Sequence, residues 1–283
     1  MPTSPPQQAP PVQRLRIRYA KRGRLRFTSH RDFGRAFERA VQRAGLPIAF
    51  SSGFSPHPRI SYAGAAPTGA SSEAEYLEIG LREPVDPAAV KVALDAALPD
   101  GLDVLRVVTA GPGGLADRIE ASHWQIELSG TPRAEAACAV EAFLTQPRVD
   151  VERLTKKGVR VFDCRAAVVR LAVRGSLDRD RTCAILDVVV RHGTPSVRPD
   201  DVLAGLHKTA GLTPAEAPRV LRLAQGPLDQ RSGTVGDPLD VDRDASWQER
   251  PRQTRSDDTR ATEPPGDASP LREPTRCEVP PQA

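Results

Sequence analysis

Apolar and polar residues alternate strictly over residues 15–19, where Leu, Ile and Tyr are separated by Arg16 and Arg18. Such alternation predicts a strand with one arginine-bearing face. After a basic turn at 21–24, residues 25–27 are expected to extend the strand. Ser29 then precedes a helical pattern and has Asp32 three residues later, which is a capping-box arrangement.

The predicted helix after Ser29 has two distinct faces. Its apolar residues recur at helical spacing and form one buried stripe: Phe33, Ala36, Phe37, Ala40, Val41 and Ala44. Its arginines step by four along another face: Arg31, Arg35, Arg39 and Arg43. Gly45 stands where a helix usually ends. The pattern therefore predicts an amphipathic helix with a cationic exposed side.

The same patterning predicts further strands at 46–50, 59–63, 75–81 and 102–108, with a helix over 86–98 that has Pro87 in its first turn. The order β-α-β-β-α-β is that of a ferredoxin-like domain, here over residues 14–110. A glycine-rich break at 111–114 separates this unit from the rest.

A second pass follows over residues 120–228. Strands are expected at 123–128, 167–173, 184–190 and 220–223, helices at 133–144 and 199–209, and a hairpin of 149–154 with 159–162 around Lys156 and Lys157. We predict an α+β fold of two ferredoxin-like units in tandem. Residues 1–13 are expected to be a disordered lead-in, and residues 229–283, with eight prolines and little apolar periodicity, a disordered tail.

Charge is distributed unevenly along the chain. Residues 14–59 carry twelve Arg or Lys and two acids, whereas the remainder is slightly acidic. A preference for Arg over Lys, which the whole chain shows, does not explain why acids are missing from this one segment. The concentration of positive charge predicts a polyanionic partner such as nucleic acid.

Several classes of protein are excluded by what the sequence lacks. No apolar run approaches the roughly 20 residues that span a bilayer, and the Pro- and Gln-rich start is no secretory signal. Four widely spaced cysteines argue against a disulfide framework and a cysteine metal cluster. Phosphate-binding, dinucleotide-binding and zinc-protease signatures are also absent. We expect a cytoplasmic protein with no membrane segment and no metal.

The loop of Gly53, Phe54, Ser55, Pro56, His57, Pro58 and Arg59 is the best candidate for chemistry. Two prolines fix the backbone on both sides of His57, which would aim its imidazole as a general acid or base, a phosphate donor or a positioning group. His57 could equally satisfy a backbone carbonyl in a rigid loop. His30, at the start of the helix, is the second candidate. Glu75 either meets an arginine on the core face or is solvated.

The N-terminal motifs resemble a known family. The run Leu25, Arg26, Phe27, Thr28, Ser29, His30, Arg31, Asp32, the helix that follows, the Gly53–Arg59 loop and residues 69–81 are similar to the radical SAM-linked (radical SAM-associated) protein family. The resemblance covers about residues 14–225 and is most specific over 14–81. Arg31 and Gly34 depart from the family pattern, which has an apolar residue and a helix former there.

The resemblance implies a domain of unknown function that is fused to, or encoded beside, a radical SAM enzyme. This chain lacks the three cluster cysteines of such enzymes, so it resembles the separate form. S-adenosylmethionine, an iron–sulfur cluster and, as often in this family, cobalamin are then expected on the partner enzyme and none of them on this chain.

We therefore expect a non-catalytic accessory protein that presents RNA, such as tRNA or rRNA, to a partner radical SAM enzyme. One alternative is a metal-independent RNA endonuclease that uses His57. Another is an adaptor that binds an acidic protein and no nucleic acid. The expected RNA or partner contacts are Arg16, Arg18, Lys21, Arg22, Arg24, Arg26, Ser29, His30, Arg35, Arg39, Gly53, Phe54, Ser55, Pro56, His57, Pro58, Arg59 and Glu75.

Overall fold

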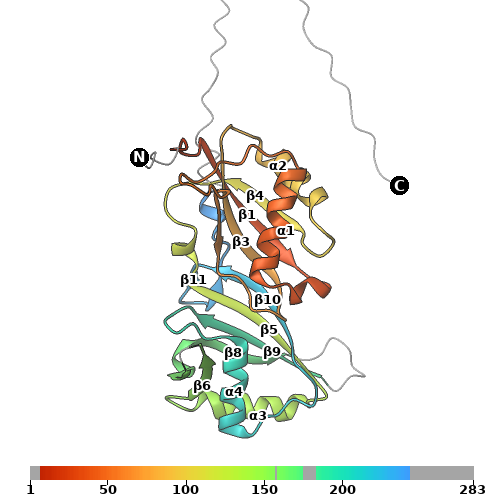
Figure 1. Cartoon of the computed structure of the whole chain (residues 1–283). Coiled ribbons are helices and arrows are strands. Elements are labelled where there is room, and N and C mark those ends of the chain that lie inside the picture. The colour runs from red at the N-terminus through yellow and green to blue at the C-terminus, as the bar shows by residue number, and fades with distance from the viewer. Residues whose placement is uncertain (1–6, 157, 175–182, 243–283) are drawn as a thin grey trace, which may run out of the picture. The chain divides into compact units, whose positions relative to one another are not determined.

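A computed structural model of the chain describes residues 7–156, 158–174 and 183–242 (Figure 1). Its first half contains β1 (Gln13–Lys21), η1 (Gly23–Phe27), α1 (His30–Arg43), β2 (Ile60–Ala63), β3 (Ser71–Leu81), α2 (Pro87–Ala97) and β4 (Val104–Thr109). The predicted helices and most of the predicted strands are confirmed in this half. Ser29 caps α1, because its hydroxyl accepts a hydrogen bond from the Asp32 amide.

Two local predictions in the first half are wrong. Residues 25–27 belong to the 3₁₀ helix η1 and do not extend β1, because Gly23 adopts a left-handed conformation with φ 53° and turns the chain. Residues 46–50 form no strand and only make isolated bridges, at Ile48 with Leu81 and at Phe50 with Pro58. Pro47 cannot donate a ladder hydrogen bond within that segment.

The second half contains η2 (Ala116–Arg118), β5 (Ala121–Ser129), α3 (Arg133–Leu144), β6 (Asp150–Thr155), β7 (Gly158–Asp163), η3 (Arg165–Ala167), β8 (Val168–Arg174), β9 (Cys183–Arg191), α4 (Pro199–Ala210), β10 (Arg219–Gly226), β11 (Leu228–Asp229) and β12 (Thr234–Val235). The predicted hairpin is confirmed as β6 and β7, although Lys157 lies outside the described residues.

One large mixed sheet runs through both halves in the order β4-β1-β3-β10-β5-β9-β8, and β2 also pairs with β3. Its other pairings are antiparallel, but β10 and β3 pair in parallel over two positions, Leu221 with Ser71 and Arg222 with Ser72. This parallel junction joins the two halves. The predicted α+β class is confirmed, while the division into two ferredoxin-like units stays a prediction.

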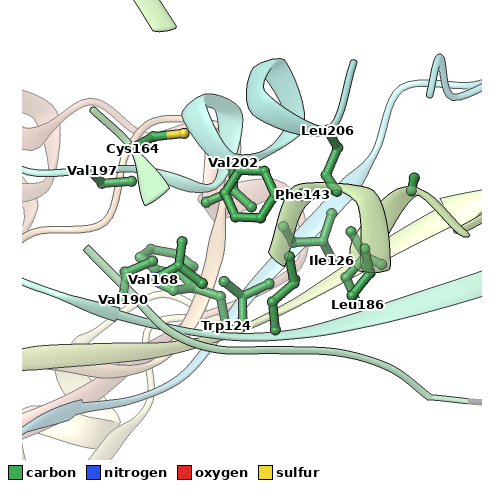
Figure 2. Close-up of a cluster of buried hydrophobic side chains, with 14 of the residues drawn as sticks. Trp124, Ile126, Phe143, Cys164, Val168, Leu186, Val190, Val197, Val202 and Leu206 are labelled. Atoms are coloured by element: carbon green, nitrogen blue, oxygen red, sulfur yellow. The ribbon is translucent and has the colours of Figure 1, made fainter. Parts of the chain in front are cut away.

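Each half has its own apolar core between the sheet and a pair of helices. In the first half α1 and α2 contribute Phe33, Phe37, Val90 and Leu94, which pack against β1, β3 and β4. In the second half side chains from α3, α4 and the sheet meet in one cluster (Figure 2). Helix α4 approaches closely at Gly205, where a Cβ atom would lie 2.7 Å from the Phe143 ring.

The predicted disordered tail begins too early at residue 229. Residues 229–242 contain the end of β11 and all of β12, and the segment 236–242 that follows packs Leu239 and Asp242 into fully buried positions. The composition of this segment was misleading. The segment is short and charged and is held mainly by ion pairs, so it lacks the apolar periodicity that would have predicted an ordered structure. Residues 243–283 and 1–6 of the predicted disordered ends lie outside the described residues.

No helix in the described ranges is long and apolar enough to cross a membrane.

Candidate functional site

The arginines of β1 do not form an exposed surface. Arg16 is completely buried, and its guanidinium donates to both carboxylate oxygens of Asp242 at 2.9 Å and to Glu78 at 2.9 Å. Burial lowers the pKa of Arg16, but the hydrogen bonds to Glu78 and Asp242 outweigh it, so the pKa is raised overall. Arg16 therefore stays charged and structural, and it cannot meet a phosphate in this conformation.

The segment 236–242 covers the rest of this face with carboxylates. Asp237 accepts from Arg18 and from Arg106, each at 3.1 Å. Asp242 also pairs with Arg118 at 2.9 Å. Two of the twelve bases of residues 14–59, Arg16 and Arg18, are thus paired with acids more than two hundred residues away in the chain.

Two further bases of the predicted set are also engaged. Arg22 pairs with Glu73 and with Asp103, the latter at 2.6 Å, although its side chain stays 46% exposed. Lys21 is buried, and its ammonium donates to the Ala66 carbonyl at 3.4 Å. Burial lowers the pKa of Lys21, and Glu75 partly offsets this.

Helix α1 carries the basic surface that remains exposed. Arg31, Arg35 and Arg39 are all exposed, and within the described residues none of them forms an ion pair. The buried residues of α1 are Phe33, Phe37, Ala40 and Val41, so the arginines occupy the opposite side. Four residues advance a helix by about 6 Å, so these three guanidiniums form a track of about 12 Å along the axis.

The exposed positive charge continues from α1 into η1. Arg24 is exposed and unpaired among the described residues, and the Arg26 guanidinium lies 4.6 Å from the centre of the Phe27 ring. Phe27 itself is 59% exposed. η1 and α1 together thus form a continuous stretch of free guanidiniums with one exposed aromatic ring.

His30 lies at the start of this stretch and contacts an aromatic cluster. Its ring meets Tyr62 edge-on at 4.9 Å, and Tyr62 meets Phe33 at 5.8 Å. Burial raises the pKa of Tyr62 to about 12, so its hydroxyl stays protonated. A Cβ atom at Gly34 would lie 3.5 Å from this hydroxyl, which is an ordinary van der Waals contact. Packing against Tyr62 therefore does not explain the departure from the family pattern at Gly34.

The loop with His57 is exposed and is tied down through its backbone. Ser51 accepts a hydrogen bond from the His57 amide at 3.0 Å, and the Ser51 amide donates to the His57 carbonyl at 2.9 Å. In the part of the chain that the structure describes, neither ring nitrogen of His57 has a hydrogen-bond partner. The loop presents the imidazole and the 76% exposed Phe54 to solvent and does not bring His57 and His30 into contact.

Glu75 lies on the core face and meets an arginine, which is the first of the two alternatives that the sequence left open. Arg222 of β10 donates to Glu75, to Ser72 at 3.1 Å and to the Gly64 carbonyl at 2.6 Å. Gln225 completes the cluster, since its amide donates to Ala74 at 2.7 Å. This buried polar network spans the parallel junction of β3 and β10, so Glu75 is a structural residue.

A pocket of about 700 Å³ lies beside the same junction. It is bounded by Arg22, by Arg26 and Phe27 of η1, by residues 67–71, by Gln125 and Glu127 of β5, and by the start of α4 and residues 216–221. The pocket and Arg222 were both missed at the sequence level. Phe27, a large apolar residue directly after Arg26 in a basic segment, is the signal that could have indicated the pocket.

Within the described ranges, no group of three or more His, Cys, Asp and Glu side chains is arranged to hold a metal ion.

A family model described as "Uncharacterized protein conserved in bacteria (DUF2344)" matches residues 14–199. The chain belongs to the DUF2344 family. The matched region includes β1, α1 and the His57 loop, so the basic surface of α1 lies in the family's part of the chain. No curated protein matches.

Similarity between this DUF2344 chain and solved structures is weak. A Cbf5-Nop10-Gar1 complex matches at a TM-score of 0.40 and 10% identity over 79% of this chain and 55% of that one. An unknown protein from Galdieria sulphuraria gives 0.21, with 13% identity and 74% and 98% covered. A protein from Shewanella oneidensis, described as a "putative dyp-type peroxidase protein", gives 0.22, with 9% identity and 79% and 95% covered. The chain spans about half the length of the first, and scores this low carry no inference.

Proposed function

We propose that this protein is a cytoplasmic, non-catalytic accessory protein that binds RNA, such as tRNA or rRNA, through α1 and presents it to a separate radical SAM enzyme. The observation that supports RNA binding is the track of Arg31, Arg35 and Arg39. Their exposed guanidiniums form no ion pair within the described residues. Arginine is well suited to phosphate because it offers several donors in a rigid planar fork.

The radical SAM part of the proposal rests on the motif resemblance over residues 14–81 and on the lack of cluster cysteines in this chain. The partner would then carry S-adenosylmethionine, the iron–sulfur cluster and any cobalamin.

We also propose that each half is a ferredoxin-like unit. The strand order β4-β1-β3-β2 in the first half and β10-β5-β9-β8 in the second supports this, with β6 and β7 as an inserted hairpin. In each half the two helices contribute to the core on one side of the sheet.

The decisive experiment is a salt titration of binding to fluorescently labelled tRNA. The variant Arg35→Glu/Arg39→Glu should bind more weakly than the wild type. The slope of log affinity against log salt should become shallower by about 0.7–0.9 for each phosphate that the variant no longer binds. Lys91→Glu/Arg133→Glu is the matched control, because it makes the same charge change at exposed positions on α2 and α3. Equal effects from both variants would refute an interface on α1.

The partner is tested separately. Tagged wild-type protein should recover a radical SAM enzyme from cells of its source, identified by mass spectrometry. Recovery of an acidic protein with no RNA binding would favour the adaptor alternative. The endonuclease alternative predicts strand cleavage that is abolished by His57→Ala, and we expect no cleavage by either protein.

A further inference from the structure

The pocket beside η1 has one aromatic wall. Phe27 remains 59% exposed at the pocket rim although it is a large apolar side chain. Its backbone is held in place, because the Arg26 carbonyl accepts from the Gly69 amide at 2.8 Å and the Thr28 amide donates to the Leu25 carbonyl at 2.9 Å. An exposed aromatic ring beside a guanidinium is the kind of surface on which an unpaired nucleobase stacks.

The floor of the pocket has a different chemistry from the rim. Gln125 and Glu127 alternate along β5 with Trp124 and Ile126, which are buried in the core, so they point to the opposite face of the sheet. Glu127 lies 3.8 Å from Arg219. Asp200 and Glu216 add two more carboxylates to the lining. With Glu73, the lining has four acids, which outnumber its three arginines, Arg22, Arg26 and Arg219.

This arrangement separates two kinds of ligand group. Phosphates are attracted to the rim and to the α1 track and are repelled by the acidic floor. Carboxylate and amide oxygens on the floor accept hydrogen bonds from an amino group on a ring. A volume of about 700 Å³ lies within the ordinary range for small-molecule sites, which is roughly 300–1,000 Å³.

We infer that the pocket holds one unstacked nucleobase with an exocyclic amino group, taken from an RNA strand whose phosphates lie along α1. The base stacks on Phe27, and its amino group donates to the floor at Gln125 and Glu127. Arg26 and Arg24 hold the phosphates on either side of the flipped nucleotide. This inference rests on the proposed function and names the feature of the RNA that the protein selects.

The test compares two RNAs of equal charge, labelled ten-nucleotide oligo(C) and oligo(U), in anisotropy titrations of the full-length protein. Phosphate contacts contribute equally to both RNAs, because the two have the same length and charge. The bases differ at one position, where cytosine presents an amino group and uracil a carbonyl. Wild-type protein should bind oligo(C) about tenfold more tightly, which is the lower part of the range for one well-paired base contact.

Two variants locate this preference. Phe27→Ala should weaken binding of both RNAs by about tenfold, as expected for the loss of one stacking platform. Gln125→Ala/Glu127→Ala should bring the ratio of the two affinities close to one. Leu154→Ala, which removes an 81% exposed apolar side chain outside the pocket, is the control and should change neither affinity. Thermal melting checks that each variant is folded.

The outcomes separate the two proposals. Equal wild-type affinities for both RNAs, or a Phe27→Ala protein that binds like the wild type, would overturn the nucleobase pocket. Even then, the proposed function would stand if the wild type still bound RNA in a salt-dependent way and the Arg35→Glu/Arg39→Glu variant did not. If the wild type binds neither of these RNAs nor tRNA at low salt, the proposed function fails and the inference falls with it.

Discussion

Arg222 lies in the middle of β10 and donates hydrogen bonds to four residues in the protein interior. Its guanidinium donates to Glu75, Ser72, the Gly64 carbonyl and, at 3.0 Å, to Gln225. The side chains of the charged pair, Arg222 and Glu75, are both nearly inaccessible to solvent. Removing one partner of such a pair leaves an uncompensated charge in the protein interior. We therefore expect Arg222→Met to lower the free energy of unfolding by about 3–5 kcal/mol in urea titrations.

The double variant Arg222→Met/Glu75→Leu distinguishes charge from packing. It removes both ions, so it should be more stable than Arg222→Met alone. Arg148→Ala, at an exposed pair with Asp150, serves as the control and should have little effect. If the single and double variants were equally destabilised, the charge pairing of Arg222 and Glu75 would not be the cause.

His192 should make stability depend on pH. Its Nδ1 atom donates to the Ile119 carbonyl, so its Nε2 accepts from the Ser122 hydroxyl and the ring is neutral. Burial lowers the pKa of His192 below its ordinary 6.5. The unfolded chain then binds a proton at higher pH than the folded chain does, and stability is lost as the pH falls from 6.5 through the lowered value.

We expect His192→Gln to lose less stability than the wild type between pH 7.5 and pH 5.5, measured as the urea midpoint at each pH. The amide keeps a hydrogen-bonding group in place and removes the titration. The other acids and histidines contribute to both proteins, so the comparison isolates His192. A parallel decline in the two proteins would contradict this assignment.

The arginines show why the site was only partly predictable at the residue level. Arg16 and Arg35 look alike in the sequence, and both lie in the same acid-poor segment. Alternation correctly placed Arg16 on a strand face, but its partner Asp242 is 226 residues away and no local pattern reveals it. Arg35 was predictable as exposed, because the apolar stripe of its own helix determines which side of α1 is buried.

Helix α1 offers a prediction at the scale of an element. Gly34 lies inside the helix without a positive φ, where glycine costs about 0.5–1 kcal/mol relative to alanine. A Cβ atom at this position would make only an ordinary contact, 3.5 Å from the Tyr62 hydroxyl. Gly34→Ala should therefore stabilise the protein by about 0.5–1 kcal/mol in urea unfolding.

Ser29→Ala tests the same helix from its end and should destabilise it by about 1 kcal/mol, since the cap to the Asp32 amide is lost. Destabilisation by Gly34→Ala would contradict the prediction for Gly34. It would mean that the Tyr62 hydroxyl needs the space beside Gly34 for a reason other than packing, and the contact of His30 with Tyr62 would be the first to test by mutation.

Elements with a clear periodicity of apolar residues were predictable from the sequence. Elements whose backbone conformation depends on a single residue were not. The capped, amphipathic α1 and the alternating β1 follow from their own residues. η1 depends on the conformation of Gly23, and the segment around Pro47 fails to form a strand because one amide donor is missing. Periodicity contains no information about such single-residue effects.

At the scale of the whole molecule, the acidic segment 236–242 packs back against the first half of the chain. Composition alone predicted a disordered tail from residue 229, because this segment is held by ion pairs with distant arginines and therefore shows no apolar periodicity. Asp242 is fully buried between Arg16 and Arg118, and the Gly111 amide also donates to it at 2.9 Å. One carboxylate thus connects β1, the break between the halves and the end of the described chain.

Asp242→Asn should lower the free energy of unfolding by about 2–3 kcal/mol, measured in urea. This is below the roughly 3–5 kcal/mol typical of a broken buried pair, because Glu78 still compensates Arg16. Asp240→Asn, which changes a 58% exposed carboxylate in the same segment, should cost at most about 1 kcal/mol.

Folded Asp242→Asn protein should bind tRNA with the wild-type salt slope, because Arg16 stabilises the sheet and does not contact phosphate. A steeper slope would mean that Arg16 contacts phosphate once Asp242 is neutralised, and that the acidic segment competes with RNA for Arg16.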